Sequence, residues 1–250
     1  MKTAERFSDR VENYVRYRPG YPETMLEVFL EEMGLVPSSF VVDIGCGPGQ
    51  SSVPFLEFGC KVCGVEPNEF MRNAAAEILA GYERFEAVEG NAHATGLEDK
   101  SVDVAVAAQA FHWFNDEETV SEFGRILKPG GFTALIWNER QLGTTPFLRD
   151  YEALLLEFGT DYRSVRHDVI TPDELTRAFD KEFRLSTYPN AQVLDLEGVK
   201  GRLMSSSYTP PEGDPSFRPM IEKLESIFAE HNESDRIQVL YDTNVFYTQF

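Results

Sequence analysis

The stretch FVVDIGCGPGQSS, residues 40–52, decides the fold that this sequence predicts. Its first five residues are apolar apart from Asp43, which is typical of a strand buried inside a parallel sheet. Three glycines on alternate positions follow at once. Because glycine has no Cβ, such a turn lets backbone N–H groups approach a ligand closely, and open α/β sheets bind ligands at this end of a strand. The stretch therefore predicts a buried strand followed by a ligand-binding loop.

The spacing of the glycines discriminates between ligands. A dinucleotide fingerprint needs the pattern G-x-G-x-x-G, but counting from Gly45 and Gly47 the sixth position is Gln50. A phosphate-binding P-loop is not matched either, because no Gly-Lys-Ser/Thr follows. The pattern that remains is D-x-G-x-G-x-G, formed by Asp43, Gly45, Gly47 and Gly49.

Short apolar runs alternate with helical patterns up to residue 138, which is the signature of βαβ units and a parallel sheet. Helices are predicted from Pro22, over 67–81, and after an Asn115 cap, with the third ended by Pro129 to Gly131. Strands are predicted at 40–44, 61–66, 84–88, 102–108 and 132–137.

The remainder of the chain predicts a different arrangement. Helices are indicated at 146–158, 172–179 and 219–231, and strands at 182–188 and 239–247. If both strands join the sheet, an insertion between them can lie over its edge as a lid. The predicted organisation is a cover segment and helix (1–36), a ligand-binding core (37–139), helices and a sixth strand (140–189), the helical lid (190–236) and a final strand (237–250).

Composition and charge narrow the partners. A chain of 250 residues with 42% hydrophobic content can bury a full core. A formal net charge of −19 repels a phosphate backbone and an anionic membrane surface, so we expect neither nucleic acid nor membrane as a partner. No uninterrupted apolar run reaches the ~18 residues of a membrane span, and the first twenty residues contain no apolar signal region. We expect a cytoplasmic monomer or homodimer.

The three cysteines, Cys46, Cys60 and Cys63, fit a reducing compartment, because an odd number cannot all pair within one chain. Cys60 and Cys63 have the spacing of a redox motif, but they lie across the start of a predicted strand and not at a helix N-terminus, where a thiolate is stabilised. A closed zinc site needs four ligands, and no histidine or second cysteine pair lies near in sequence. We expect packing cysteines and no metal.

The D-x-G-x-G-x-G pattern resembles the principal cofactor motif of the class I S-adenosylmethionine-dependent methyltransferases. Further motifs follow in the order typical of that family: VCGVEPN with Glu66, EGNAHATGL with Asn91 where Asp is commoner, and ILKPGGFTALIW before the fifth strand. The resemblance extends from about residue 7 to the end of the chain. It implies a Rossmann-like, doubly wound, mostly parallel seven-stranded sheet with an antiparallel last strand and a helical cap.

The resemblance also implies the cofactor, S-adenosylmethionine, and the product S-adenosylhomocysteine. In the family, the acid after the second strand holds the ribose hydroxyls, and the segment after the third strand reaches the adenine. The cofactor-binding residues implied in this way are Asp43, Gly45, Cys46, Gly47, Gly49, Glu66, Pro67, Met71, Asn91, Ala92, Gln109, Ala110 and Phe111.

Two segments resemble one branch of the family, the small-molecule methyltransferases related to trans-aconitate and farnesoic-acid methyltransferases. They are VAVAAQAFHWF (104–114) and FSDRVENYVRYRPGYP (7–22). In that branch the residues after the fourth strand face the methyl group and the substrate, and the N-terminal segment covers the pocket. The substrate and cover residues implied here are Tyr14, Tyr17, Arg18, Tyr21, His112 and Trp113.

Methyl transfer from a sulfonium is an in-line displacement that depends mainly on alignment. A general base is needed only where the accepting atom carries a proton. His112 is the candidate base, and a pocket-wall histidine that only forms hydrogen bonds is the alternative. Arg18 suits carboxylate capture and is expected to meet His112 across the pocket; the alternatives are that it holds the cofactor's carboxylate or pairs with Glu12.

The sequence therefore predicts a methyltransferase that acts on a small molecule, and the expected acceptor is a small organic acid or another compact polar molecule with an apolar body. Two other functions remain open at this point. One is an NAD-dependent oxidoreductase on a similar sheet, and the other is a non-catalytic protein that binds S-adenosylmethionine.

Overall fold

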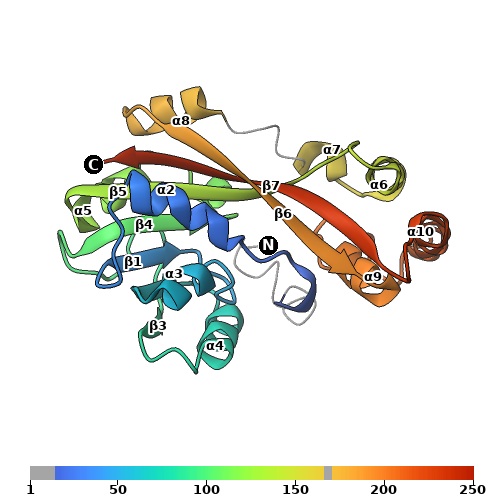
Figure 1. Ribbon diagram of the computed structural model, residues 1–250, viewed down its shortest axis with the longest axis horizontal. Coiled ribbons are helices and arrows are strands. Elements are labelled where there is room, and N and C mark those ends of the chain that lie inside the picture. Colours follow the sequence, from blue (N-terminus) through green and yellow to red (C-terminus); the bar gives the residue numbers. More distant parts are fainter. Residues whose placement is uncertain (1–14, 166–170) are drawn as a thin grey trace.

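The computed structural model describes residues 15–165 and 171–250, and it is built around one seven-stranded sheet (Figure 1). The strand order is β3-β2-β1-β4-β5-β7-β6. β1 to β5 run parallel, and β7 is antiparallel to both of its neighbours, which confirms the predicted fold class. The strands are β1 Phe40–Ile44, β2 Lys61–Val65, β3 Phe85–Val88, β4 Val102–Ala108, β5 Leu127–Arg140, β6 Arg184–Leu194 and β7 Ile237–Gln249.

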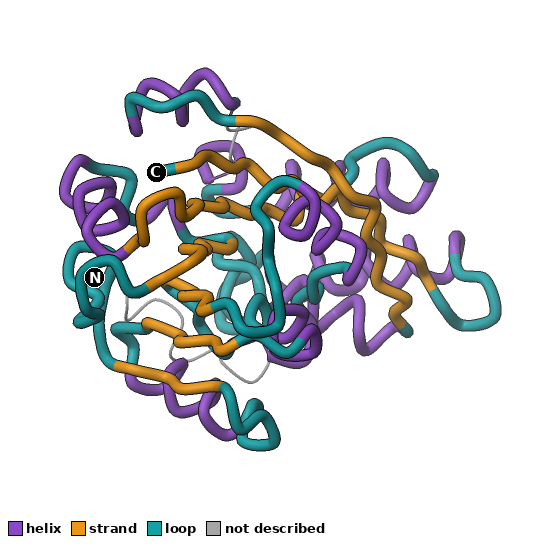
Figure 2. The backbone as a smooth tube through the Cα atoms, turned by 60° about the vertical axis from the view of Figure 1, so that its left-hand side comes forward, coloured by secondary structure: helices purple, strands orange, loops and turns teal. Residues whose placement is uncertain are grey.

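Helices cover both faces of the parallel part of the sheet (Figure 2). Successive residues of β1 point to opposite faces, so Val41 packs in one core and Val42 in the other. The first core contains residues of η3 (Glu23–Met25), α2 (Leu26–Glu31) and α3 (Val53–Phe58). The second contains residues of α5 (Glu117–Ile126) and α8 (Pro172–Phe179). Burial on both faces explains why β1 and β4 are apolar runs in the sequence, interrupted only by Asp43 and Asp103.

The last three strands of the sheet are longer than the sequence indicates. Their outer halves leave the parallel region and carry a third core, formed with α6 (Pro146–Phe158), α7 (Tyr162–Val165), α9 (Leu196–Met204) and α10 (Phe217–His231). We call this part the second lobe and the rest the first lobe. Because β6 continues to Leu194, the first five residues of the predicted 190–236 insertion are strand, and its helices are α9 and α10.

Several element boundaries differ from the sequence prediction. The cap of α5 is Asp116 and not Asn115, because the Asp116 carboxylate accepts from the Thr119 N–H at 2.9 Å. β5 begins at Leu127, where a helix stop was expected, because Leu127 pairs with Val102 through an irregular register. The first predicted helix begins with the 3-10 turn η3, and α4 spans only Glu69–Ile78. The starts of β3 and α10 and the end of β2 also differ from the predicted positions.

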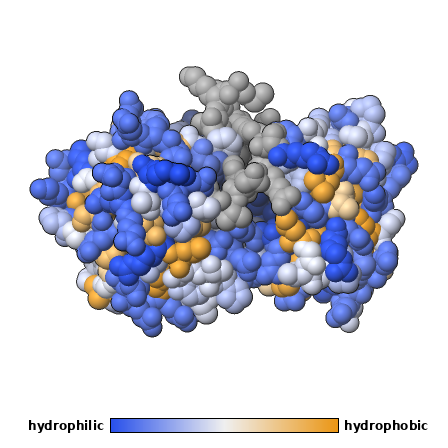
Figure 3. Space-filling view, turned by 90° about the horizontal axis from the view of Figure 1, so that it is seen from above, coloured by the Kyte–Doolittle hydropathy of each residue, from blue (hydrophilic) through white to orange (hydrophobic). Residues whose placement is uncertain are grey.

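The face of the molecule in Figure 3 is hydrophilic over most of both lobes, with scattered apolar side chains. This agrees with the large excess of acidic residues in the sequence. None of the helices within residues 15–165 and 171–250 combines the length and the hydrophobicity that crossing a membrane requires.

Candidate functional site

A cavity of about 300 Å³ lies at the carboxyl ends of β1, β2 and β4. This is where the chain order across the sheet reverses between β1 and β4, the position at which open α/β sheets bind ligands. The predicted site residues that line the cavity are Tyr21, Gly45, Cys46, Gly47, Glu66, Pro67, Met71, Asn91, Gln109, Ala110 and Trp113. Gly45 and Gln109, which are 64 residues apart in the sequence, thus line the same cavity.

The three glycines of the loop each have a positive φ, at +72°, +55° and +87°, but they differ in what surrounds them. A Cβ on Gly45 would lie 2.9 Å from the Cβ of Ala110, and one on Gly49 would lie 2.5 Å from Leu79 Cδ1. A Cβ on Gly47 would meet no heavy atom within 4 Å. Gly45 and Gly49 are therefore required by packing, whereas Gly47 leaves open space beside the cavity that it lines.

Asp43 supports the loop from below and does not line the cavity. Its Oδ2 accepts hydrogen bonds from the hydroxyls of Ser51 and Ser52, at 2.6 and 2.8 Å. The side chain is fully buried, and its Oδ1 has no hydrogen-bond partner among the described residues. Burial raises the pKa of Asp43 from 3.8 to about 6, although the two serine hydroxyls lower it. Asp43 thus connects β1 to the start of α3, a role that differs from the predicted cofactor contact.

The raised pKa of Asp43 predicts that the protein is more stable at mildly acidic pH. The folded state binds a proton at Asp43 more tightly than the unfolded chain does, so this stabilisation is lost as the pH rises through about 6. Relative to Asp43→Asn, which does not titrate, the wild-type free energy of unfolding should fall by about 1.4 kcal/mol between roughly pH 5 and pH 7.5. Denaturant titrations at both pH values measure the difference, and a difference independent of pH would contradict the prediction.

Glu66 lies at the end of β2 with both carboxylate oxygens directed at backbone N–H groups. Oε2 accepts from Gly47 at 3.0 Å and Oε1 accepts from Asn68 at 2.9 Å. The residue is only 8% exposed, and this burial raises its pKa, while the two backbone hydrogen bonds oppose the rise. Glu66 is therefore an acceptor at the wall of the cavity, joined directly to the glycine loop.

Asn91 lines the cavity, but its Oδ1 already accepts from the N–H groups of His93 and Ala94, at 2.9 and 3.1 Å. The predicted use of this carbonyl for the adenine amino group would compete with the turn that it stabilises. Ala92 is buried and does not line the cavity. His93 does line it, and its ring nitrogen Nε2 lies 2.8 Å from the Asp116 carboxylate.

Of the residues that follow β4, some line the cavity and others pack in the hydrophobic core. Gln109 has a φ of +53° and donates through Nε2 to the carbonyl of Asn138 at 3.0 Å. Phe111 is fully buried and packs against Phe114 and Phe179, so it supports the wall without lining the cavity.

His112 and Trp113 lie side by side in the 3-10 turn η4 (Phe111–Trp113), with ring centroids 4.6 Å apart. Trp113 lines the cavity and is 43% exposed, whereas His112 is half-buried and does not line it.

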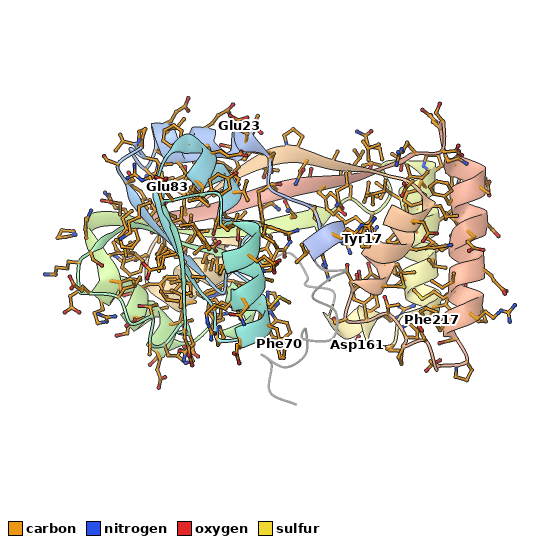
Figure 4. All side chains as sticks on the ribbon, turned by 90° about the horizontal axis from the view of Figure 1, so that it is seen from below. Tyr17, Glu23, Phe70, Glu83, Asp161 and Phe217 are labelled. Carbon is orange, nitrogen blue, oxygen red and sulfur yellow. The ribbon has the colours of Figure 1, made fainter. Side chains whose placement is uncertain are left out.

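The described part of the N-terminal segment, residues 15–21, connects the two lobes. Tyr21 lines the cavity, and Val15 accepts a hydrogen bond through its carbonyl from Gln50 Nε2. Tyr17 lies against Gly201 of α9, between the lobes in Figure 4. The predicted cover residue Tyr14 lies outside the described residues.

Arg18 donates through Nη2 to the carbonyl of Ser205, at the C-terminal end of α9, at 2.9 Å. It thus reaches into the second lobe. Its predicted contact with His112 stays a prediction.

Seven residues that line the cavity were not predicted. Gln50, Ser51 and Pro48 belong to the stretch that carries the glycines, and the Asn68 side chain caps α4, a role that the pattern Asn-Glu at a helix start could have indicated. The others are His93, Ala108 and Phe114, each next to a predicted residue or two positions away.

The cysteines have the packing role that was expected. All three are free and buried, and burial raises the pKa of Cys60 and Cys63 to about 11. Thiols with such pKa values are poor nucleophiles at neutral pH.

The cavity fits S-adenosylmethionine on two observations. The open space at Gly47 admits a ligand against the backbone, which a Cβ would obstruct. The buried carboxylate of Glu66, an acceptor-only group when ionised, lies where a ligand with two hydroxyl groups can donate to it.

Comparison with known proteins gives consistent results. The methyltransferase domain family matches residues 42–135. A methyltransferase-like protein of Schizosaccharomyces pombe is 26% identical over 96% of this chain and 93% of its own length. Among solved structures, a candidate type II methyltransferase from Anaeromyxobacter dehalogenans superposes with a TM-score of 0.68 at 20% identity, over 93% of this chain and 98% of that one.

A second solved structure, phosphoethanolamine N-methyltransferase 2 from Haemonchus contortus in complex with S-adenosyl-L-methionine, superposes with a TM-score of 0.57 at 14% identity, over 99% of this chain and 60% of that one. These structural likenesses concern the fold alone. An uncharacterized methyltransferase of Mycobacterium tuberculosis is more informative, because it is 30% identical over 80% of this chain and 78% of its own length. Identity at that level over most of both chains exceeds a likeness of fold, and this chain therefore belongs to the class I S-adenosylmethionine-dependent methyltransferases.

Proposed function

We infer that this protein transfers the methyl group of S-adenosylmethionine to a small organic molecule, and that this acceptor is an organic acid. The observation that carries the inference is the cavity at the ends of β1 and β4, with open space at Gly47 and the carboxylate of Glu66 beside it. Its volume of about 300 Å³ suits a small molecule.

The protein's own residues would bind and align the reactants. When bound, S-adenosylmethionine supplies a methyl group that its positive sulfur already activates. Gly47 allows close approach of the backbone, and Glu66 accepts from the ribose hydroxyls. Trp113 and Phe114 give the cavity aromatic walls. Alignment of this kind contributes up to ~7–11 kcal/mol to lowering a barrier.

A small acceptor is favoured over a nucleic acid by charge. Within residues 15–165 and 171–250, no lysine or arginine lines the cavity, and the whole chain carries a net charge of −19. A polyanionic substrate would be repelled on approach.

An organic acid is favoured by Arg18 and by the sequence resemblance to carboxylic-acid methyltransferases. The planar guanidinium matches a carboxylate in a bidentate geometry, and Arg18 lies three residues from Tyr21, which lines the cavity.

The proposal is tested by incubating the protein with methyl-labelled S-adenosylmethionine and panels of small carboxylic acids, phenols and amines. We expect label in at least one carboxylic acid. Transfer only to amines or phenols would contradict the acceptor class. Tight binding of the cofactor with no transfer to any acceptor would instead favour the non-catalytic alternative.

His112→Ala should lower kcat by less than about tenfold if the accepting atom is an already ionised carboxylate, because no proton then has to be removed. Turnover of the best acid acceptor measures this, with Trp113→Phe as a control for loss of packing against the ring. A loss of ~10²–10⁴ would show instead that His112 acts as a general base on an acceptor that carries a proton.

A further inference from the structure

The second lobe contains a cluster of arginine and tyrosine side chains that the proposed chemistry does not use. It is assembled from β5, α6, α7, α9, β7 and the segment before Tyr21, elements that lie far apart in the sequence. We call it the arginine–tyrosine cluster; its members are Arg18, Arg140, Arg202, Tyr151, Tyr162, Tyr208 and Tyr241, together with Glu152.

Arg202 is the centre of this cluster and has no acidic partner. It is 8% exposed, and it donates to the Tyr241 hydroxyl from Nε at 3.1 Å and to the Ser206 hydroxyl from Nη1 at 3.0 Å. No aspartate or glutamate of the described residues forms an ion pair with it. A guanidinium that is removed from water without an anion is costly, so such groups are normally paired.

The carboxylate of the cluster, Glu152, does not compensate the charge of Arg202. It is engaged by Arg140 at 2.5 Å and by the Tyr162 hydroxyl at 2.6 Å. Arg202 instead donates to the hydroxyls of a tyrosine and a serine. In a chain with a net charge of −19, a buried arginine with no acidic partner among the described residues is the opposite of what the composition predicts.

Two tyrosines indicate that an anion belongs in this cluster. The Tyr151 side chain is 3% exposed, and its hydroxyl has no hydrogen-bond partner within the described residues. Burial opposes the ionisation of Tyr208, but the guanidiniums of Arg202, Arg18 and Arg140 outweigh it and lower the Tyr208 pKa. The arginines therefore favour a negatively charged oxygen at the position of the Tyr208 hydroxyl.

The cluster adjoins the cavity along two paths. Arg18 and Tyr21 are three residues apart, so their Cα atoms are separated by at most about 11 Å. On the other path, Gln109 of the cavity wall donates to the carbonyl of Asn138, two residues before Arg140 on the same strand. On each path only a few residues separate the cavity wall from the cluster.

We propose that the arginine–tyrosine cluster binds an oxyanion of the methyl acceptor, a carboxylate or a phosphate that does not itself receive the methyl group. Arg202 neutralises its charge, and the Tyr151 hydroxyl donates a hydrogen bond to it. The inference rests on the proposed function, because it makes the acceptor a molecule with at least one fixed negative charge besides its reacting atom.

The test uses the full chain loaded with S-adenosylhomocysteine, and calorimetry with two probes, propane-1,2,3-tricarboxylate and inorganic phosphate. The neutral triamide of the first probe is the ligand control. We expect at least one anion to bind and the triamide not to bind. The tighter of the two anions then distinguishes a carboxylate-bearing acceptor from a phosphate-bearing one.

Two variants localise the anion to the cluster. Arg202→Met keeps most of the side-chain volume and should weaken anion binding by about 10- to 100-fold, and Tyr151→Phe, which removes one hydroxyl, should weaken it by about 3- to 10-fold. Arg218→Met is the matched control, because Arg218 lies on α10 of the same lobe with an 88% exposed side chain. The affinity for S-adenosylhomocysteine should stay the same in all three.

Arg202→Met should also raise the melting temperature in the absence of anions, since it removes a buried charge without an acidic partner. If this variant does not fold, Tyr151→Phe alone decides the question.

Failure of this inference can be distinguished from failure of the proposed function. Anion affinity that is the same in wild type, Arg202→Met and Tyr151→Phe would overturn the cluster as the binding site, and so would the absence of binding by either anion. Anion binding that depends on Arg202, in a protein that methylates no acid, would support the cluster and contradict the proposed reaction.

Discussion

Gly47→Ala is expected to weaken the binding of S-adenosylmethionine by about 10- to 100-fold, while the protein remains folded. A Cβ at this position meets no protein atom within 4 Å, so it projects into space that the ligand needs. Forcing one extra carbon into such a contact costs about 1–3 kcal/mol. The φ of +55° adds a separate cost to folding, about 1–2 kcal/mol for any residue with a Cβ.

Gly34→Ala is the matched control for this prediction. Gly34 has a φ of +66°, and a Cβ there also meets no heavy atom within 4 Å, but it follows α2 and lies away from the cavity. Both variants should lose similar stability in denaturant titrations. Calorimetry should find weaker cofactor binding in Gly47→Ala alone, and equal affinities in the two variants would contradict the assignment of the loop.

Glu66→Ala is expected to weaken cofactor binding by about tenfold or more. The change removes a charged acceptor for the ribose hydroxyls, and each hydrogen bond to a charged group contributes about 1.5–3 kcal/mol. It also releases the N–H groups of Gly47 and Asn68 from the carboxylate, which loosens the loop. Glu86→Ala, at an exposed position on the neighbouring strand β3, is the control and should bind as wild type does.

The pH dependence of binding gives an independent measure of the same group. Because burial raises the pKa of Glu66, protonation begins at a higher pH than for an exposed glutamate, and the protonated group accepts fewer hydrogen bonds. Cofactor affinity of the wild type should fall as the pH is lowered toward this pKa, and the affinity of Glu66→Gln should fall less. A Glu66→Ala variant with an unchanged dissociation constant would mean that the ribose is held by another residue; fully buried Asp43 is not available for that role.

Much of the first lobe could be read from the sequence because its signals are local. A strand buried on both faces is a continuous apolar run, a turn with positive φ needs glycine, and a helix end needs a capping side chain. These requirements concern neighbouring residues, so β1, β4 and α8 of the first lobe were predicted with the bounds that the structure has, and so was α6 of the second lobe. The order and spacing of the motifs then indicated the family.

The extent of β6 and β7 could not be predicted in the same way. β6 alternates between half-buried and exposed positions, and it includes Pro189 and Asn190, which disfavour a strand. Its pairing with β7 from Arg184 to Leu194 compensates for these residues. The second lobe is a product of this long pairing, and no local pattern contains that information.

The sequence by itself determined that a glycine loop follows a buried strand, that Glu66 ends the second strand, and that the sheet has its seven strands in this class of fold. Only the tertiary structure decided that Gly47 alone among the three loop glycines leaves open space, that Asp43 accepts from two serines, and that Arg202 is buried with no acidic partner among the described residues. The physical reason is range. Backbone conformation and strand burial are dictated by adjacent residues, whereas the pairing of a buried charge depends on side chains that folding brings together from distant segments.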